Sequence, residues 1–226
     1  MTTVLLVRHG LTAMTGPLLA GWTPGVHLDD RGREQATALA GRLLPLPVAG
    51  VVSSPLERCQ ETAAALAVGR DLLVETDDRL GECRYGDWTG QELKKLAKDP
   101  LWKVVQAHPS AARFPGGEAL RETQARAVDA VRSHNEAFGA DATWVAVSHG
   151  DVIKSIVADA LGLHLDLFQR IQVDPCSLTV IRYTELRPFV LRLNDTGGGI
   201  ADLLPAKRRR RKASSDAAVG GGAGTA

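Results

Sequence analysis

The sequence contains few residues that could cross-link the chain. Its 226 residues include three cysteines, Cys59, Cys83 and Cys176, and no two of them form a Cys-x-x-Cys pair. An odd and sparse set argues against a disulfide framework, and no cysteine or histidine cluster has the spacing of a metal site. The sequence therefore predicts reduced thiols and no bound metal.

Long hydrophobic runs are also missing. No apolar stretch approaches the roughly 20 residues that a membrane span requires, and the first ten residues, MTTVLLVRHG, lack the basic start and the longer apolar run of a secretion signal. We therefore expect a cytoplasmic protein without a membrane partner. Because 44% of the residues are hydrophobic, residues 1–204 are expected to form one globular domain.

The net charge of +1 conceals an uneven distribution along the chain. Residues 207–212 read KRRRRK, which leaves 21 Lys and Arg against 25 Asp and Glu in residues 1–204. A slightly acidic body does not favour a nucleic-acid partner, although the basic run could bind one. Residues 205–226 hold like charges, glycine and alanine, so we expect them to be a disordered tail.

Hydrophobic patterning predicts alternating strands and helices. The apolar run at 4–7 (VLLV) and the runs at 48–52 and 143–147 are typical of buried strands. A third short strand is expected at 72–75, and residues 177–183 and 189–193 would close the sheet as a hairpin. Helices are expected at 30–44, 55–66, 90–97, 118–138 and 151–161. This order predicts an α/β fold, a three-layer α/β/α sandwich around a mainly parallel sheet.

Two predicted strands end in the same way. The first strand is followed by Arg8-His9-Gly10 and the strand at 143–147 by Ser148-His149-Gly150. Ligands bind beyond the carboxyl ends of parallel strands, so these residues can be neighbours in space. Two histidines and an arginine there, close to helix N-termini, would suit an anionic group.

Two further residues fit the same edge of the sheet. Arg58, in SSPLERCQETA, stands in the first turn of the helix after the second strand, and Glu82 stands in the loop LGECRYGDWTG. Guanidinium groups match phosphate oxygens, and a carboxylate beside a cationic pocket is suited to general acid catalysis if burial raises its pKa. The combination indicates a phosphoryl pocket.

These segments together resemble the histidine phosphatase superfamily, which has the phosphoglycerate-mutase-like fold. The set comprises VRHG, SSPLERCQETA, the Glu82 loop, FPGGE and VSHG, in the family's order over residues 3–195. The resemblance implies that His9 is a nucleophile that forms a phosphohistidine, and that Arg8, Arg58 and His149 hold the phosphoryl oxygens. Glu82 would protonate the leaving group and then activate water. No metal or cofactor is implied.

The resemblance also implies substrate contacts. These would involve Arg8, Thr12, Thr15, Ala20, Gly21, Arg58, Arg84, Tyr85 and Gly150. The sequence departs from the phosphoglycerate mutases: Thr15 replaces an asparagine, Leu93 falls at the position of a substrate lysine, and an Arg-Arg pair has no equivalent. A mutase needs such cations to hold its phosphorylated product. We therefore favour hydrolysis of a small phosphomonoester.

Other functions stay open at this point. A phosphoglycerate-type phosphomutase, a phosphate-binding regulatory module without turnover and a phosphoprotein phosphatase all fit the same motifs. The resemblance is compatible with a homodimer, and the sequence does not decide the oligomeric state.

Several neighbouring residues have ordinary structural interpretations. Cys59 is expected to be a buried thiol and not a nucleophile. His27 is expected to be a surface or core histidine, with a place at the pocket rim as the alternative, and Arg113 is a candidate outer substrate contact. The aromatic residues Trp22, Tyr85 and Trp88 could form a substrate wall or pack in the core.

Overall fold

The computed structural model describes residues 1–198 and Gly220. The predicted tail, residues 205–226, lies outside the described residues except for Gly220. The described residues form six strands: β1 (Thr2–Arg8), β2 (Val51–Ser53), β3 (Val74–Thr76), β4 (Thr143–Ser148), β5 (Leu178–Tyr183) and β6 (Pro188–Asp195).

The helices alternate with the strands, as the sequence predicts. The α-helices are α1 (Asp30–Leu43), α2 (Glu57–Ala67), α3 (Leu93–Leu96), α4 (Pro100–Ala107), α5 (Leu120–Phe138) and α6 (Gly150–Ala160). Within residues 1–198, the 3-10 helices η1 (Asp78–Leu80), η2 (Gly86–Trp88), η3 (Pro109–Ala111) and η4 (Leu165–Arg170) lie in the connections. No helix of the described residues is long and apolar enough to cross a bilayer.

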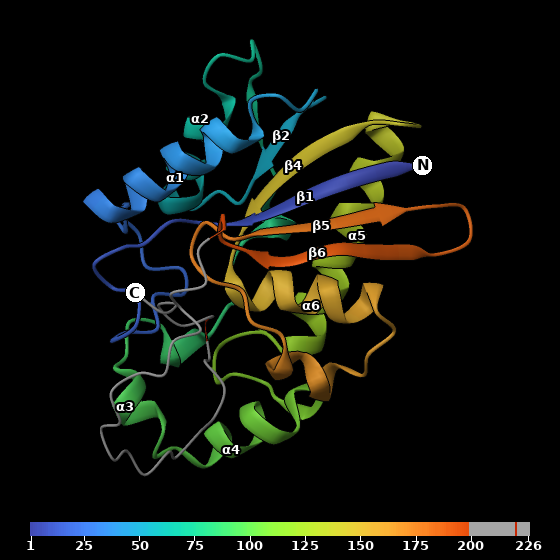
Figure 1. Cartoon of the computed structure of the whole chain (residues 1–226). Helices are drawn as coiled ribbons and strands as arrows, with labels where there is room; N and C mark the ends of the chain where they lie inside the picture. Colours follow the sequence, from blue (N-terminus) through green and yellow to red (C-terminus); the bar gives the residue numbers. More distant parts are fainter. Residues whose placement is uncertain (199–219, 221–226) are drawn as a thin grey trace.

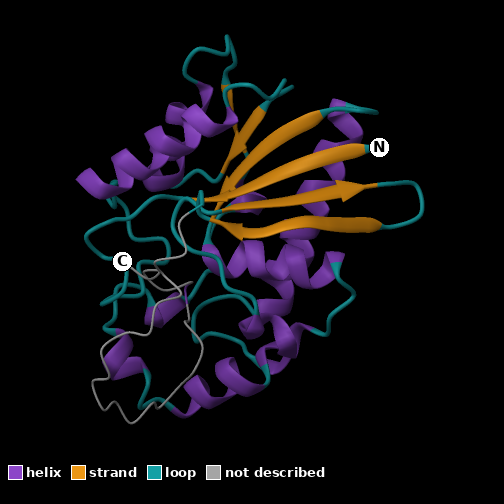
Figure 2. Ribbon diagram, in the orientation of Figure 1, coloured by secondary structure: helices purple, strands orange, loops and turns teal. Residues whose placement is uncertain are grey.

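The strands form one sheet in the order β3-β2-β4-β1-β5-β6. The pairs β3·β2, β2·β4 and β4·β1 are parallel, whereas β5 and β6 form an antiparallel hairpin at one edge. Helices α1 and α2 cover one face of the sheet, and α5 and α6 cover the other (Figure 1). Figure 2 shows the resulting layers, so the predicted three-layer α/β/α sandwich is confirmed.

Two hydrophobic cores explain why the central strands are apolar on both faces. Leu6 and Val4 of β1 pack with α5 and α6, whereas Leu5 and Val7 pack with α1 and α2. A strand covered on both faces needs a continuous apolar run, which is the pattern of VLLV. The sequence signal for β1 therefore reflects its central position.

The structure differs from the prediction mainly at element ends. Strand β2 begins at Val51 and not at 48, and α3 is shorter than the helix expected at 90–97. Helix α4 was not predicted. It begins with Pro100 after Asp99, whose carboxylate accepts a hydrogen bond from Leu101 N, which is a helix-start signal of the kind that Asp and Pro provide.

Candidate active site

The carboxyl ends of β1, β2 and β4 meet at one edge of the sheet (Figure 1). Arg8, the last residue of β1, pairs with Ser148, the last residue of β4. His9 and His149 follow directly, and their ring centroids lie 5.2 Å apart. The parallel pairing of β1 with β4 therefore brings together histidines that are 140 positions apart in the sequence.

The glycine after His9 is required by the packing of α1. A Cβ on Gly10 would lie 2.6 Å from Gly32 O, and one on Gly32 would lie 2.1 Å from Leu11 O. Asp29 caps α1 by accepting a hydrogen bond from Gly32 N at 2.8 Å. These close approaches fix the chain that follows β1, and with it the position of His9.

The His9 ring is held with one nitrogen available for attack. Its Nδ1 lies 2.8 Å from Gly10 O, and because a carbonyl oxygen only accepts, Nδ1 carries the proton and donates it. Its Nε2 lies 3.4 Å from Arg58 Nε and accepts from it. Burial, followed by the charges of Arg58 and Arg8, holds the pKa of His9 well below its usual range. His9 is therefore a neutral imidazole with a bare Nε2.

Arg58 brings an uncompensated positive charge to His9. It stands in the first turn of α2, is 1% exposed, and forms no ion pair with any described residue. Its Nη2 donates to Gly21 O at 2.8 Å, and its buried Nη1 has no hydrogen-bond partner among residues 1–198 and Gly220. A buried guanidinium N–H without an acceptor is costly, which indicates that an anion binds here.

Arg8 supplies a second buried guanidinium. It is 2% exposed, and its Nη1 donates to Val173 O at 2.8 Å. Burial lowers its pKa, and the carboxylates of Glu82 and Asp151 oppose that change. Two arginines beside two neutral histidines give the pocket the charge that a phosphate dianion requires.

Glu82 is the carboxyl group of the pocket. It is 4% exposed, its Oε1 accepts from Cys83 N at 2.9 Å, and its Oε2 lies 3.8 Å from His149 Nδ1. Burial, together with the charge of Asp151, raises the pKa of Glu82 from 4.5 to about 7, against the opposing effect of Arg58. An acid with this pKa can both donate and accept a proton near neutral pH.

A hydrogen bond to Ser54 fixes the ring of His149. Its Nε2 lies 2.8 Å from Ser54 Oγ and its Nδ1 lies 3.3 Å from Arg58 Nη2. The ring is fully buried, and burial, followed by the charges of Arg58 and His9, holds its pKa well below the usual value. Cys59 Sγ lies 3.4 Å from His149 Nε2, but burial raises the pKa of that thiol to about 12, which agrees with an inert buried thiol.

The loop at 12–21 forms the wall of the pocket. Thr12 Oγ1 and Thr15 Oγ1 are 2.9 Å apart, and Leu19 N donates to Gln91 O, which ties this loop to the segment before α3. The wall carries both polar and apolar side chains. The pocket is lined by Arg8, His9, Thr12, Met14, Thr15, Gly16, Leu18, Leu19, Ala20, Gly21, Arg58, Glu82, Leu93 and Gly220.

Three residues predicted to contact substrate do not line this pocket. The guanidinium of Arg84 stacks over the Trp22 ring at 3.9 Å, and Tyr85 is fully buried with its ring against Phe114. Gly150 is the buried first residue of α6. Neither Arg84 nor Tyr85 follows a regular element, so the sequence did not fix the directions of their side chains.

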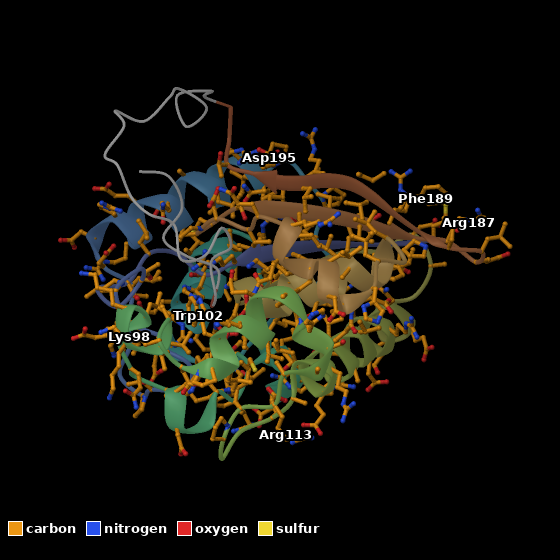
Figure 3. All side chains as sticks on the ribbon, turned by 90° about the horizontal axis from the view of Figure 1, so that it is seen from below. Lys98, Trp102, Arg113, Arg187, Phe189 and Asp195 are labelled. Carbon is orange, nitrogen blue, oxygen red and sulfur yellow. The ribbon has the colours of Figure 1, made fainter. Side chains whose placement is uncertain are left out.

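Arg113, the candidate outer contact, and His27, the alternative rim residue, do not line the pocket either. His27 is exposed and pairs with Glu61, and Arg113 is exposed and pairs with Glu122. Figure 3 shows Arg113 at the outer edge of the molecule. Both residues form ion pairs at the surface, which agrees with the surface position expected for His27.

Sequence reasoning missed Arg126, which holds the Glu82 loop. Its guanidinium donates to the carbonyl oxygens of Arg79, Gly81 and Glu82 at 2.7, 2.8 and 2.9 Å and pairs with Glu118 at 2.6 Å. Glu118 in turn accepts from Arg84 N at 2.8 Å. The glutamate of FPGGE was visible in the sequence, whereas its partner on α5 was not.

Among residues 1–198 and Gly220, no group of three or more His, Cys, Asp or Glu side chains could hold a metal ion.

Comparison with known proteins places this site in a family. The model of the histidine phosphatase superfamily (branch 1) matches residues 4–196. Phosphoserine phosphatase 1 of Hydrogenobacter thermophilus is 29% identical over 210 residues, covering 87% of this chain and 93% of the relative. A Yersinia pestis protein named probable phosphoglycerate mutase GpmB is 29% identical over 187 residues, covering 82% and 86% of the two chains.

A solved structure has the same fold. The mycobacterial glucosyl-3-phosphoglycerate phosphatase Rv2419c superimposes with a TM-score of 0.76 at 26% identity, covering 85% of this chain and 98% of that one. The matched residues include Arg8, His9, Arg58 and Glu82, which line one pocket, and His149, which is buried against His9 and Arg58. The chain therefore belongs to the histidine phosphatase superfamily (branch 1).

Proposed function

We propose that this protein hydrolyses a small phosphomonoester through a phosphohistidine on His9, without a metal. The observation that carries the proposal is the bare Nε2 of a buried neutral His9, 3.4 Å from Arg58 Nε. An imidazole nitrogen beside an uncompensated guanidinium is a nucleophile placed where a phosphoryl group binds.

The first step transfers the phosphoryl group to His9. Nε2 attacks phosphorus, the N–P bond forms, and the bond from phosphorus to the ester oxygen breaks. Arg8 and Arg58 neutralise charge on the equatorial oxygens, as electrostatic stabilisation of a phosphoryl transition state requires. Glu82, protonated below about pH 7, donates its proton to the leaving alkoxide.

The second step returns His9 to its starting form. Glu82 is now a carboxylate and takes a proton from a water molecule, whose oxygen attacks phosphorus. The N–P bond breaks and inorganic phosphate leaves. A pKa near 7 suits both halves of this cycle because the acid of the first step is the base of the second.

The relatives support a small phosphorylated metabolite as the substrate class. Those named as phosphatases act on phosphoserine and on glucosyl-3-phosphoglycerate, which are both phosphomonoesters. The mutase name of one relative keeps the phosphomutase as the second candidate. Leu93 lines the pocket at the position where the resemblance expects a substrate lysine, and this apolar contact favours hydrolysis.

The test is hydrolysis of p-nitrophenyl phosphate by the full chain between pH 4 and 8, with and without EDTA. We expect turnover that EDTA does not reduce and that His9→Ala abolishes. His27→Ala, an exposed histidine paired with Glu61, is the matched control and should retain full activity. Turnover that survives His9→Ala would refute the nucleophile assignment, and phosphoryl exchange between phosphoglycerates without hydrolysis would favour the mutase.

Two further expectations stay predictions from the sequence. They are the cytoplasmic location and the homodimer, and light scattering on the purified full chain measures the second directly.

A further inference from the structure

One residue from near the C-terminus lies inside the pocket. Gly220 lines it together with His9, Arg58 and Glu82. Its backbone has φ +72°, and a Cβ added to it would lie 2.9 Å from Leu19 Cδ1 and 4.0 Å from Tyr85 Oη. Gly220 therefore fills a narrow space between the 12–21 wall and the Tyr85 hydroxyl, where a glycine fits and a larger residue meets a neighbour.

The backbone N–H of Gly220 has a specific partner in this space. It donates to Asp151 Oδ2 at 3.0 Å, and the Tyr85 hydroxyl donates to the same oxygen at 2.8 Å. Asp151 belongs to the first turn of α6, two positions after His149, and is fully buried. Gly220, which lines the pocket, thus reaches a fixed carboxylate oxygen that lies directly behind the pocket lining.

The other oxygen of Asp151 is engaged by a cation. Lys154 Nζ lies 3.4 Å from Asp151 Oδ1 and 3.2 Å from Gln169 Oε1, and Lys154 is 2% exposed. Because a buried ammonium already balances the carboxylate, a second cation at Oδ2 would lie close to a like charge. A neutral donor such as a hydroxyl matches Oδ2 better, and the neutral peptide N–H of Gly220 occupies that place.

We infer that Asp151 is a specificity-determining residue, whose Oδ2 accepts a hydrogen bond from a hydroxyl on the alcohol part of the substrate. The substrate class is then phosphate esters of polyols or of other hydroxylated alcohols. In the free enzyme the Gly220 N–H donates to Asp151 Oδ2, and the substrate hydroxyl takes the place of this N–H when the substrate binds. This inference rests on the proposed function for the phosphoryl end of the substrate.

The test measures binding and not turnover, so it can fail independently of the proposed function. Calorimetric Kd values are measured on the full-length His9→Ala chain, which leaves esters intact, for glycerol 3-phosphate, n-propyl phosphate and phosphoethanolamine. A hydrogen bond to a carboxylate predicts that the glycerol ester binds about tenfold more tightly than the propyl ester. Phosphoethanolamine, with an ammonium group, should gain no such preference.

Asp151→Asn in the same background should reduce the preference for the glycerol ester several-fold, because a neutral amide oxygen accepts more weakly than a carboxylate. Asp159→Asn is the matched control, an aspartate on the same helix that pairs with Arg132 at the surface. Equal Kd values for the glycerol and propyl esters, no binding of either, or a preference unchanged by Asp151→Asn would overturn the inference. Tightest binding of phosphoethanolamine would overturn the choice of a neutral donor.

A second variant changes Gly220 itself. Gly220→Val places a branched side chain against Leu19 and should displace residue 220 from Asp151, so the glycerol ester should bind several-fold more tightly. Gly198→Val is the control, since that glycine also has a positive φ but no atom within 4 Å of an added Cβ. An unchanged Kd in Gly220→Val would show that the Gly220 N–H does not hold the hydroxyl position. If the native chain does not hydrolyse p-nitrophenyl phosphate, that result would instead refute the proposed function.

Discussion

Replacing Glu82 by glutamine should make the free protein more stable at alkaline pH while it removes catalysis. The Glu82 carboxyl is 4% exposed, and burial raises its pKa from 4.5 to about 7. The folded state therefore holds a proton that the unfolded chain releases at lower pH. Glutamine has nearly the shape of the protonated acid, and its amide oxygen can still accept from Cys83 N.

The size of the effect follows from proton linkage. A group whose pKa is higher in the folded state stabilises the fold fully below its unfolded pKa, here about 4.5, and loses that contribution as the pH rises to about 7. Each pH unit in this window costs about 1.4 kcal/mol, so the loss is on the order of 3 kcal/mol. Glutamine does not titrate, so the Glu82→Gln variant does not incur this loss.

Urea unfolding of the wild type and of Glu82→Gln at pH 4.5 and pH 8 measures the difference. We expect similar unfolding free energies at pH 4.5 and an advantage of about 3 kcal/mol for the variant at pH 8. The low pKa values of His9 and His149 destabilise both proteins below pH 6.5, so this opposite trend largely cancels in the comparison. Glu75→Gln, at an exposed position, is the control. If the unfolding free energies of the variant and the wild type differ by the same amount at both pH values, Glu82 is not protonated in the folded state as this reasoning requires.

Three further predictions follow from the packing around the site. Ser54→Ala removes the hydroxyl that lies 2.8 Å from His149 Nε2 and should lower kcat about tenfold or more. The control is Ser53→Ala, which removes a hydroxyl that bonds to the Ser54 carbonyl and should leave kcat within about twofold. Equal effects of the two variants on kcat would contradict a positioning role for Ser54. Gly86→Ala should destabilise the fold by about 2 kcal/mol or more in urea unfolding, since φ of Gly86 is +52° and the new Cβ would lie 2.0 Å from Pro115 O. An unchanged unfolding midpoint would be inconsistent with that clash. Cys59 should resist iodoacetamide at pH 8 until urea is added, because burial raises its pKa to about 12, and rapid labelling of the native protein would argue against its burial.

The sequence was sufficient to predict which residues meet at the common edge of the sheet. Arg8, His9 and His149 follow strands whose continuous apolar runs identify them as central and parallel, and such strands end at a common edge. Arg58 follows from its place in the first turn of the helix after β2. These positions are set by regular elements, whose direction the pattern reveals.

The remainder of the pocket depends on loops and on tertiary contacts. The apolar wall residues Leu18, Leu19 and Leu93 meet through pairing between two loops, for which single-sequence patterns carry no signal. Arg84 stacks over Trp22 and does not line the pocket, a placement that the sequence did not reveal because loop residues have no periodicity to orient their side chains. The substrate contact proposed for Asp151 had no sequence signal for another reason, since an aspartate in the first turn of a helix is ordinarily explained by the helix dipole.

The central claim is a covalent phosphoryl group on His9, and the Glu82→Gln variant offers the most direct test. p-Nitrophenolate leaves without protonation, so phosphoryl transfer to His9 should proceed, whereas hydrolysis lacks its base. After mixing the variant with radiolabelled p-nitrophenyl phosphate and quenching in alkali, we expect about one phosphoryl group per chain, labile in acid and mapped to His9. Turnover without bound label, or label on another residue, would contradict the phosphohistidine mechanism.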